Sequence, residues 1–383
     1  MDARRLEFRE LTLDEFAKTR FKSASFLQSV EMFRRYQALE REAYLIGVVE
    51  QGMDAEGAKK AQKRSEKGKI VAAGLVLMRN WHFGKKIMTV PGGWLIEYDR
   101  GDWREILKFL TSEMRKFARE HGAMMVRISP NITSEPRDNE NRVVSGKKYL
   151  DVKQELMNLG YKYLGESEQV KWEYVLELPG KTPEDYIMEI RTTHRQLIRK
   201  AERDGVRVRE LRGDELGVLK KIAAESGERH GFRDPEVEYY QSMKDAFGEK
   251  VKFLVAEIPE KKMRKEDRAE IEVKNGFVPL AASMFVDDGR EVVYLYSGSV
   301  RKLQRYNGVY AIQWRMITEA MKNGRERYNF YGVRPVAGNG VYRFKQGFRG
   351  HVEELLGTFV LPVGLFGALY VKRLKTQEYG EIA

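Results

Sequence analysis

The chain has 383 residues, of which 42% are apolar and 11% aromatic, so it is long enough for two domains and can bury a core. Its 69 Lys and Arg residues outnumber the 57 Asp and Glu residues by 12. This charge excludes a chain built to repel polyanions and favours nucleic acid, phosphorylated substrates or an anionic membrane face as partners. Cysteine is absent, which excludes disulfides, thiolate metal sites and a cysteine nucleophile. Without an apolar signal-peptide core or a run of ~18 apolar residues, the sequence predicts a soluble cytoplasmic protein.

The first half of the chain alternates predicted strands with a helix. Residues 103–120 carry apolar side chains at helical spacing. The stretch 51–69 holds six basic and three acidic residues, which favours a solvated insertion over a phosphate-contacting loop. Short apolar runs predict strands at 43–49, 70–78, 87–90 and 123–128.

The second half repeats this order of elements. Thr182 followed by Pro183 is typical of a helix start and predicts one helix over 183–204. The order predicts an α/β (α+β) fold with mixed sheets and flanking helices. Further helices are predicted at 216–230, 237–247 and 309–323, and strands at 170–178, 251–257, 280–286, 291–297 and 327–332.

A stripe of arginines marks the helix predicted after Pro183. Arg191, Arg195, Arg199 and Arg203 are spaced by four and therefore share one helix face. The segment 191–209 has seven basic and two acidic residues. Stacked like charges cost helix stability, and arginine pairs well with phosphate, so the stripe favours contact with phosphate or nucleic acid over a plain solvent face.

A second basic cluster covers residues 325–349, with six Lys and Arg residues and Glu326 as the only acid. Cations beside aromatic faces suit a single-stranded nucleotide end. Ordinary core aromatics explain the same pattern equally well, so both interpretations stay open. The interleaved aromatics are Tyr328, Phe330, Tyr331, Tyr342, Phe344 and Phe348.

Several common catalytic patterns are missing from the sequence. The five histidines have no metal-ligand spacing, so no metal site is expected. No G-x-S-x-G motif is present. The segment 304–311 opens a predicted helix after a strand, where acyl-CoA transferases bind pyrophosphate, but its single glycine matches their Gly-rich turn only weakly.

Seven segments in register carry a family resemblance. They resemble the FemABX/MurM family of aminoacyl-tRNA-dependent peptidoglycan interpeptide-bridge transferases, from about residue 25 to the C-terminus. They are SFLQSVEM (25–32), VRISP (126–130), IRTTHRQLIRKAERDGVRV (190–208), ERHGF with EYY (228–232, 238–240), YLYSGS (294–299), YAIQWRMI (310–317) and YRFKQGF (342–348).

The resemblance implies two tandem GNAT-like acyltransferase domains with mixed sheets and the substrate cleft between them. The expected bounds are 1–167 with about 356–383 for the first domain and 168–355 for the second. FemA-like members carry a coiled-coil arm where this chain has only the short charged stretch 259–274, so it looks closest to the FemX type. In that type the last helix, here about 363–375, returns to the first domain.

The resemblance also implies an activity and its partners. Family members move an amino acid from aminoacyl-tRNA to the side-chain amine of the third residue, here expected to be L-Lys, of the pentapeptide precursor. The acceptor is UDP-MurNAc-pentapeptide or lipid II, and no cofactor is expected. Lys345, with Phe344 beside it, matches a family lysine implicated in holding the tRNA acceptor end and the reacting ester. Tyr239 and Tyr296 match tyrosines that line the muramyl-pentapeptide site.

Other family positions match less closely. The basic pair that binds the diphosphate has Arg34 and Arg35 as nearest candidates for one member. The second member falls at Pro235, so Arg233 is the substitute candidate. Ser129 stands where FemX-like members have an acid, which puts a protein general base there in doubt.

The chemistry of the residues agrees with such a transferase. An aminoacyl ester is already activated, so the enzyme orients an amine against the carbonyl and stabilises the oxyanion, for which a lysine cation suffices. Three rivals remain: a tRNA-dependent transferase acting on a phospholipid or a protein N-terminus, a CoA-dependent N-acyltransferase, and a non-catalytic RNA-binding module. The apolar, basic-tipped tail 361–375 is expected to pack on the first domain, with peripheral contact to the inner membrane face as the second interpretation.

Overall fold

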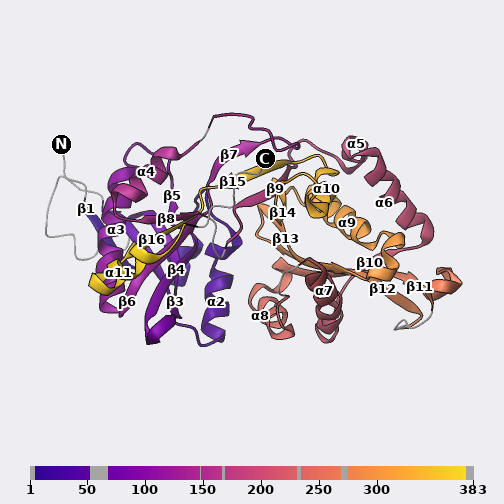
Figure 1. Cartoon of the computed structure of the whole chain (residues 1–383), viewed down its shortest axis with the longest axis horizontal. Coiled ribbons are helices and arrows are strands. Elements are labelled where there is room, and N and C mark those ends of the chain that lie inside the picture. The colour runs from indigo at the N-terminus through magenta and orange to yellow at the C-terminus, as the bar shows by residue number, and fades with distance from the viewer. Residues whose placement is uncertain are drawn as a thin grey trace. The chain divides into compact units, whose positions relative to one another are not determined.

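The computed structural model describes residues 5–51, 68–146, 148–165, 169–230, 234–268 and 275–376. The chain divides into two compact units, each with its own sheet (Figure 1). Unit 1 comprises 1–135, 146–171 and 354–383, and unit 2 comprises 136–145 and 172–353. The bounds expected from the sequence differ from these units mainly at 136–145, which were expected in the first domain.

Unit 1 is built on a mixed sheet whose described strands follow the order β1-β2-β3-β4-β6-β16-β8, with β5 paired to β3. Neighbouring strands are antiparallel except β4 and β6, which run parallel. The C-terminal strand β16 is therefore an interior strand of a sheet made mostly of N-terminal sequence. The strands are β1 (Arg5–Glu10), β2 (Ala43–Gln51), β3 (Lys69–Asn80), β4 (Lys86–Gly92), β5 (Leu95–Ile96), β6 (Ala123–Pro130), β8 (Lys162–Gly165) and β16 (Thr358–Pro362).

Alternation along β16 shows how helices cover both faces of this sheet. Phe359 and Leu361 join the core formed with α3, while Val360 packs with Val371 of α11 on the other face. The helix expected at about 363–375 is α11, and it lies in unit 1. The helices of unit 1 are α1 (Leu13–Ala17), α2 (Val30–Ala38), α3 (Trp103–Glu120), α4 (Leu150–Asn158) and α11 (Gly364–Arg373).

Unit 2 has a mixed sheet of described strands in the order β10-β11-β12-β13-β14-β9-β15-β7. Its first four strands are antiparallel, β13 and β14 are parallel, and β14 and β9 are antiparallel. The order of directions therefore repeats that of unit 1. The strands are β7 (Thr133–Arg137), β9 (Trp172–Glu177), β10 (Arg207–Glu210), β11 (Val251–Pro259), β12 (Phe277–Asp287), β13 (Glu291–Ser299), β14 (Arg327–Gly332) and β15 (His351–Leu355).

Helices also cover both faces of the unit 2 sheet. Figure 1 shows α6, α9 and α10 on one face and α7 and α8 on the other. The helices are α5 (Pro183–Glu189), α6 (Thr192–Asp204), α7 (Leu216–His230), α8 (Val237–Phe247), α9 (Gly308–Lys322) and α10 (Gly340–Gln346). Described 3-10 turns are Phe26–Gln28, His82–Gly84, Gly213–Glu215, Gly248–Lys250, Glu260–Lys262, Lys265–Asp267 and Arg301–Tyr306.

The single helix expected over 183–204 is wrong. Ile190 and Arg191 have extended backbone, with ψ of 141° and 134°, and separate α5 from α6. Ile190 is buried, and the Arg191 N–H donates to the Gly347 carbonyl instead of continuing the helix. A tertiary contact thus outweighs the local helical pattern.

The segment between β11 and β12, where an arm would be inserted, holds only two short 3-10 turns in its described part. None of the helices in the ranges described is long and apolar enough to cross a bilayer.

Candidate functional site

The parallel strand pairs of the two units differ in length. In unit 1, β4 and β6 are paired over residues 86–92. In unit 2, β13 and β14 are paired only where 291–293 meets 327–329. Beyond this point 294–299 and 330–332 are both described, yet they are not paired with each other. Backbone groups along this divergence need other partners.

Lys345 supplies donors at this divergence. It lies near the end of α10 and is 4% exposed. Its Nζ donates to the carbonyl oxygens of Phe330 (2.8 Å), Tyr331 (3.3 Å) and Gly332 (2.5 Å) on β14. These contacts use all three N–H groups of an ammonium. Burial lowers the pKa of Lys345 to about 7, although the charge of Glu173 opposes this shift.

The strand that Lys345 contacts is strained. Tyr331 has φ of 59°, a left-handed conformation that a bulky residue adopts only when its surroundings hold it there. Pairing with β9 skips between Asn329 and Gly332, so β14 carries a bulge. The Asn329 Oδ1 accepts from the Tyr331 N–H at 2.7 Å. Asn329 and Lys345 together fix this bulge.

Charged side chains lie buried or half-buried on neighbouring strands. Burial raises the pKa of Glu173 to about 6 and that of Glu291 to about 8. Burial also works to raise the pKa of Glu353, but the His351 hydrogen bond and the Arg327 cation outweigh it and lower that pKa to about 2. The Arg327 Nη2 lies 2.6 Å from the Glu353 Oε2. Of these acids, Glu173 is the one whose charge favours a cation at Lys345.

The structure brings the two predicted tyrosines together. Tyr239 on α8 and Tyr296 on the diverging part of β13 have ring centroids 5.5 Å apart in an edge-to-face arrangement. Their hydroxyls, with Glu173, also contribute to raising the pKa of the Tyr331 hydroxyl, which burial raises most. Tyr239 and Tyr296 therefore belong to the same region of unit 2 as Lys345 and its bulge.

The arginine-bearing helix α6 is fixed directly to the helix that carries Lys345. The His194 Nε2 lies 2.8 Å from the Phe344 carbonyl oxygen, and the Arg191 N–H donates to the Gly347 carbonyl at 2.9 Å. A Cβ on Gly347 would overlap the His194 ring. Burial lowers the pKa of His194, so the ring is neutral at pH 7.

The predicted arginine stripe is shorter than expected, because Arg191 caps α6 rather than lying within it. Arg195 is half-buried and donates to the Met188 carbonyl at 3.1 Å. Arg199 and Arg203 are exposed, and neither forms an ion pair with the residues that the structure describes. Farther along, Arg207 and Arg209 pair with Glu257, at 2.6 and 3.2 Å.

Tertiary contacts pair or bury half of the cations in the second basic cluster, 325–349. Arg325 pairs with Asp287 at 2.8 Å, and Arg327 pairs with Glu353. Lys345 is buried, whereas Arg343 is exposed on α10. Arg325, Arg327 and Lys345 are thus paired or buried, whereas Arg334, Arg343 and Arg349 remain exposed.

The aromatics of that cluster form core. Phe330 and Phe348 are fully buried. Phe344 is half-buried, with its ring 5.2 Å from that of Tyr310 and 5.5 Å from that of Phe348. Phe344 thus anchors α10 to the core, which sets the position of its neighbour Lys345.

Of the three other predicted binding residues, two belong to unit 1 and one cannot be described. Arg34 and Arg35 are in α2 of unit 1, Arg34 exposed and Arg35 7% exposed. Arg233 lies outside the described residues. Ser129, at the position of the family acid, has its Oγ 2.9 Å from the Thr358 Oγ1.

The single glycine of the weak CoA-type match has a packing role. A Cβ on Gly308 would approach the Leu280 Cβ to 2.8 Å, so glycine lets the start of α9 lie close against β12. Among the described residues, one group with metal-ligand geometry is Glu177, His351 and Glu353. The Arg327 cation, 3.5 Å from Glu177 and 2.6 Å from Glu353, competes with a metal ion there.

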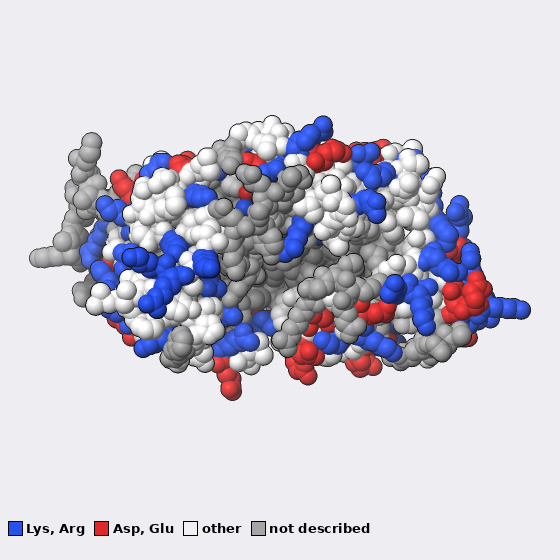
Figure 2. Space-filling model, in the orientation of Figure 1, with Lys and Arg blue, Asp and Glu red and all other residues white. Residues whose placement is uncertain are grey.

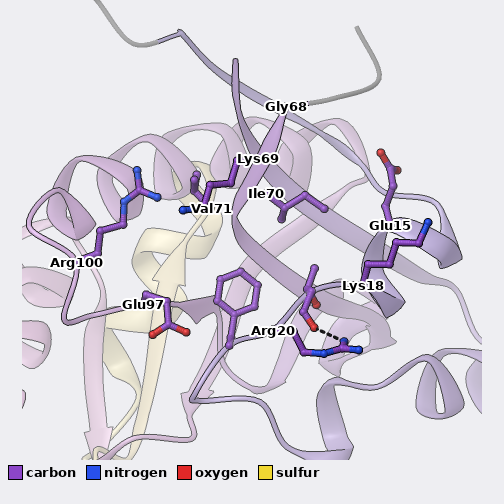
Figure 3. A pocket seen from close by; sticks show the side chains of 11 residues that line it. Glu15, Lys18, Arg20, Gly68, Lys69, Ile70, Val71, Glu97 and Arg100 are labelled. Carbon is purple, nitrogen blue, oxygen red and sulfur yellow. Dashed lines mark hydrogen bonds between the residues drawn. The ribbon is translucent and has the colours of Figure 1, made fainter. Parts of the chain in front are cut away.

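A pocket of about 480 Å³ lies in unit 1 beside the start of β3, and none of the predicted site residues lines it (Figure 3). Two of its charged side chains have partners nearby. Arg100 lies 2.9 Å from Glu50, and Glu97 accepts from the Lys22 N–H.

Glu173 and Glu291 are site residues that the sequence analysis missed. Each is an acid within an apolar strand, in WEYVLE and EVVYLY. A carboxylate at a position that the strand pattern predicts to be buried was the available signal, because buried acids need a partner or a function.

Known proteins are similar to this chain over most of its length. The sequence model of the FemAB family matches residues 9–272 and 259–371. Aminoacyltransferase FemB of Staphylococcus epidermidis is 27% identical over 368 residues, covering 78% of this chain and 84% of that protein. Aminoacyltransferase FemA of S. epidermidis strain ATCC 35984 is 24% identical over 330 residues, covering 71% and 78%.

Solved structures show the same fold. The crystal structure of FemX matches with a TM-score of 0.73 at 16% identity, covering 96% of this chain and 100% of that chain. A tandem GNAT protein from the clavulanic acid biosynthesis pathway matches with a TM-score of 0.52 at 10% identity, covering 94% and 99%. These likenesses confirm the expected fold of two mixed sheets in tandem GNAT-like arrangement.

Proposed function

The chain belongs to the FemAB family and is an aminoacyltransferase, and on this premise we propose that it builds the peptidoglycan interpeptide bridge. The donor is aminoacyl-tRNA. The acceptor is the side-chain amine of the third residue, L-Lys, of the pentapeptide precursor, either as UDP-MurNAc-pentapeptide or as lipid II. The observation that carries this proposal is the buried Lys345 ammonium at the divergence of β13 and β14, joined through α10 to the arginine-bearing α6.

The reaction requires no covalent enzyme intermediate. The neutral acceptor amine attacks the ester carbonyl carbon of the aminoacyl-tRNA, and a tetrahedral oxyanion forms. The new C–N bond remains, the ester C–O bond breaks, and the amine proton passes to the departing ribose oxygen. Positioning the two reactants and stabilising the oxyanion are then the main tasks of the protein.

Lys345 is suited to stabilising the oxyanion. Its contact with the Tyr331 carbonyl is the longest of its three, at 3.3 Å, against 2.8 and 2.5 Å for the others. We assign that N–H to the incoming ester oxygen, while the shorter contacts keep Nζ in place. Glu173, buried beside it with a pKa raised to about 6, is ionised at pH 7 and favours the charged lysine.

The remaining predicted residues take the two substrates. Tyr239 and Tyr296 contact each other on the diverging side of β13 and are assigned to the muramyl-pentapeptide. Arg199 and Arg203 are exposed cations on α6 and are assigned to tRNA phosphates, with Arg191 and Arg195 at the start of the same helix. Arg34, Arg35 and Arg233 remain candidates for the diphosphate of the acceptor.

The deciding experiment incubates the purified chain with a mixture of charged tRNAs and either UDP-MurNAc-pentapeptide or lipid II. Mass spectrometry of the acceptor is expected to show addition of one amino-acid residue at the third-position amine. Parallel reactions replace the donor with acetyl-CoA, or the acceptor with phosphatidylglycerol. Product only in one of these parallel reactions would contradict the proposed function and support the corresponding rival.

A further inference from the structure

Helix α11 carries an exposed apolar face. Its inner face is buried through Gly367 and Val371, which pack against β6 and the neighbouring core. Its outer face exposes Leu365 by 87%, Leu369 by 64% and Phe366 by 48%. A helix that is apolar on all sides is normally enclosed, so this outer face lacks the apolar partner that its sequence calls for.

The surroundings of this face are basic. Lys372 and Arg373 follow on the last turn of α11 and are exposed, and Lys375 comes directly after it. Residues 355–376 contain three basic residues and no acid. Lys85, from the loop before β4, places its Nζ 5.1 Å from the centre of the Phe366 ring. Figure 2 shows the surface over α11 as white and blue with little red.

The helix is also fixed in place beneath its exposed side chains. Lys162 Nζ donates to the carbonyl oxygens of Val371 (3.2 Å), Lys372 (3.1 Å) and Leu374 (2.6 Å) at its C-terminal end. The Trp81 Nε1 donates to the Tyr370 hydroxyl at 2.9 Å. The apolar residues are thus presented on a rigid support, and a partner would not have to order them.

We propose that the outer face of α11 docks unit 1 on an anionic lipid surface. Leu365, Phe366 and Leu369 enter the boundary between headgroups and acyl chains, while Lys85, Lys372 and Arg373 contact anionic headgroups. An apolar face bordered by cations, on a segment that has no acid from 355 to 376, matches such a surface in both properties. A protein partner of ordinary surface composition would match only the apolar part.

The biological purpose of this docking is access to an acceptor held at a membrane. That purpose rests on the proposed function. The binding itself is independent of catalysis. It is therefore tested on the full chain without tRNA or acceptor, by co-sedimentation with vesicles of phosphatidylcholine alone or of phosphatidylcholine mixed with phosphatidylglycerol.

The expected result is sedimentation with the phosphatidylglycerol vesicles that weakens as salt rises. The double variant Leu365→Gln/Leu369→Gln is expected to bind at least about tenfold more weakly, because each leucine loses its apolar burial. Lys372→Gln/Arg373→Gln is expected to weaken binding and reduce its salt dependence. Matched controls are Leu150→Gln, an exposed leucine on α4, and Lys108→Gln/Arg119→Gln, exposed cations on α3, and these should bind like the unaltered chain.

Three results would overturn the docking proposal. They are equal binding to both kinds of vesicle, unchanged binding by the α11 variants, and a loss of self-association in Leu365→Gln/Leu369→Gln, which would show that the face pairs two copies of the chain. Transfer to the soluble acceptor separates the two proposals, because the α11 variants should leave it intact. If the chain binds the vesicles but transfers no amino acid, the proposed function alone is refuted.

Discussion

At the scale of single residues, Lys345 combines features that a structural lysine seldom has. Its ammonium is buried against three backbone carbonyls on a strand that holds Tyr331 at positive φ. A purely structural contact would not need a charge here, since burial works against it and lowers the pKa to about 7. Catalysis by a preorganised cation accounts for both the burial and the strain.

Lys345→Met tests this role directly. The methionine fills similar space without a charge or an N–H donor, so transfer from charged tRNA is expected to fall about 100-fold or more. Single-turnover rates measure the effect, and circular dichroism verifies that the variant is folded. A rate within about tenfold of the unaltered chain would rule out the electrostatic role.

The pH profile of the transfer rate distinguishes a Lys345 that acts as a cation from one that acts as a general base. Below the acceptor amine's own pKa of ~10.4, its neutral fraction rises about tenfold per pH unit, and the transfer rate rises with it. Lys345 loses its charge as pH rises through about 7, so the two effects cancel and the rate levels off above that pH. Glu173, with a pKa of about 6, is already ionised in this range.

Lys345→Arg keeps the charge at every relevant pH, so any activity it retains should keep rising above pH ~7. The measurement is initial rate against pH, after subtraction of ester hydrolysis without acceptor. A rate for the unaltered chain that rises about 100-fold per pH unit below pH ~7, and still about tenfold per unit above it, would instead indicate Lys345 as a general base.

At the scale of elements, the junction of α6 with α10 connects a basic helix to Lys345, the lysine proposed to be catalytic. The His194 ring sits where a side chain on Gly347 would lie, and it contacts the Phe344 carbonyl. The rings of Tyr310 and Phe348 enclose it, at 5.0 and 5.2 Å between centroids. These contacts join α6 to the helix that carries Lys345.

Gly347→Ala is expected to force these helices apart. The new methyl group overlaps the His194 ring, and overpacking of this kind costs about 1–3 kcal/mol of unfolding free energy. Denaturant unfolding measures the loss. Adding His194→Ala removes the ring and should make Gly347→Ala nearly neutral, whereas additive effects in the double variant would show that the two residues do not compete for space.

The exposed arginines of α6 give a prediction for tRNA binding. Arg199→Gln/Arg203→Gln should weaken tRNA binding and lower the slope of log affinity against log salt by about one for each phosphate that is no longer neutralised. Filter binding over a salt series measures both quantities. Lys108→Gln/Arg119→Gln, which removes the same charge from α3, should change neither, and equal effects of the two double variants would argue against a specific interaction.

At the scale of the whole molecule, the two units are interleaved in sequence although each has its own core. Unit 1 takes its interior strand β16 from the C-terminal end of the chain. Phe359, Val360 and Leu361 of that strand are fully buried and lie between β6 and β8. The first unit therefore cannot be completed until the second has been synthesised.

A chain that ends at Glu353 is expected to lose the fold of unit 1. Removal of three buried large side chains costs about 2–5 kcal/mol each, which approaches or exceeds the total stability of a typical domain. Limited proteolysis with mass spectrometry should show cleavage throughout 5–135 and 146–171 and protection in unit 2. A chain that ends at Val363 keeps β16 and should retain protection, and equal protection in both truncated chains would contradict the assigned role of β16.

The distribution of charge was predictable only in part. The excess of 12 positive charges indicates an anionic partner, which the family resemblance implies to be tRNA. Counting charges along 325–349 overestimates the basic surface, because Arg325 and Arg327 are paired with acids that are distant in sequence. Such pairs depend on strand order, which spacing along the chain does not encode.

The candidate site was likewise predictable only in part. Lys345, Tyr239 and Tyr296 are candidates that the sequence indicates through a motif match. Glu173 and the strained Tyr331 were not found, because their importance comes from the register between β14 and β9. The break at Ile190 was missed for a similar reason, since the helical pattern continues through it while the contact with Gly347 is tertiary.

The sequence by itself determined the fold class, the two similar halves, the enzyme family and the lysine at the centre of the proposed reaction, because periodicity and motifs are local properties. Only the tertiary structure decided how β13 and β14 diverge, which carbonyls hold Lys345, which arginines remain exposed and which face of α11 is left uncovered. These features arise from pairing and burial between segments far apart in the chain, where the free energy of an interaction depends on its neighbours in space.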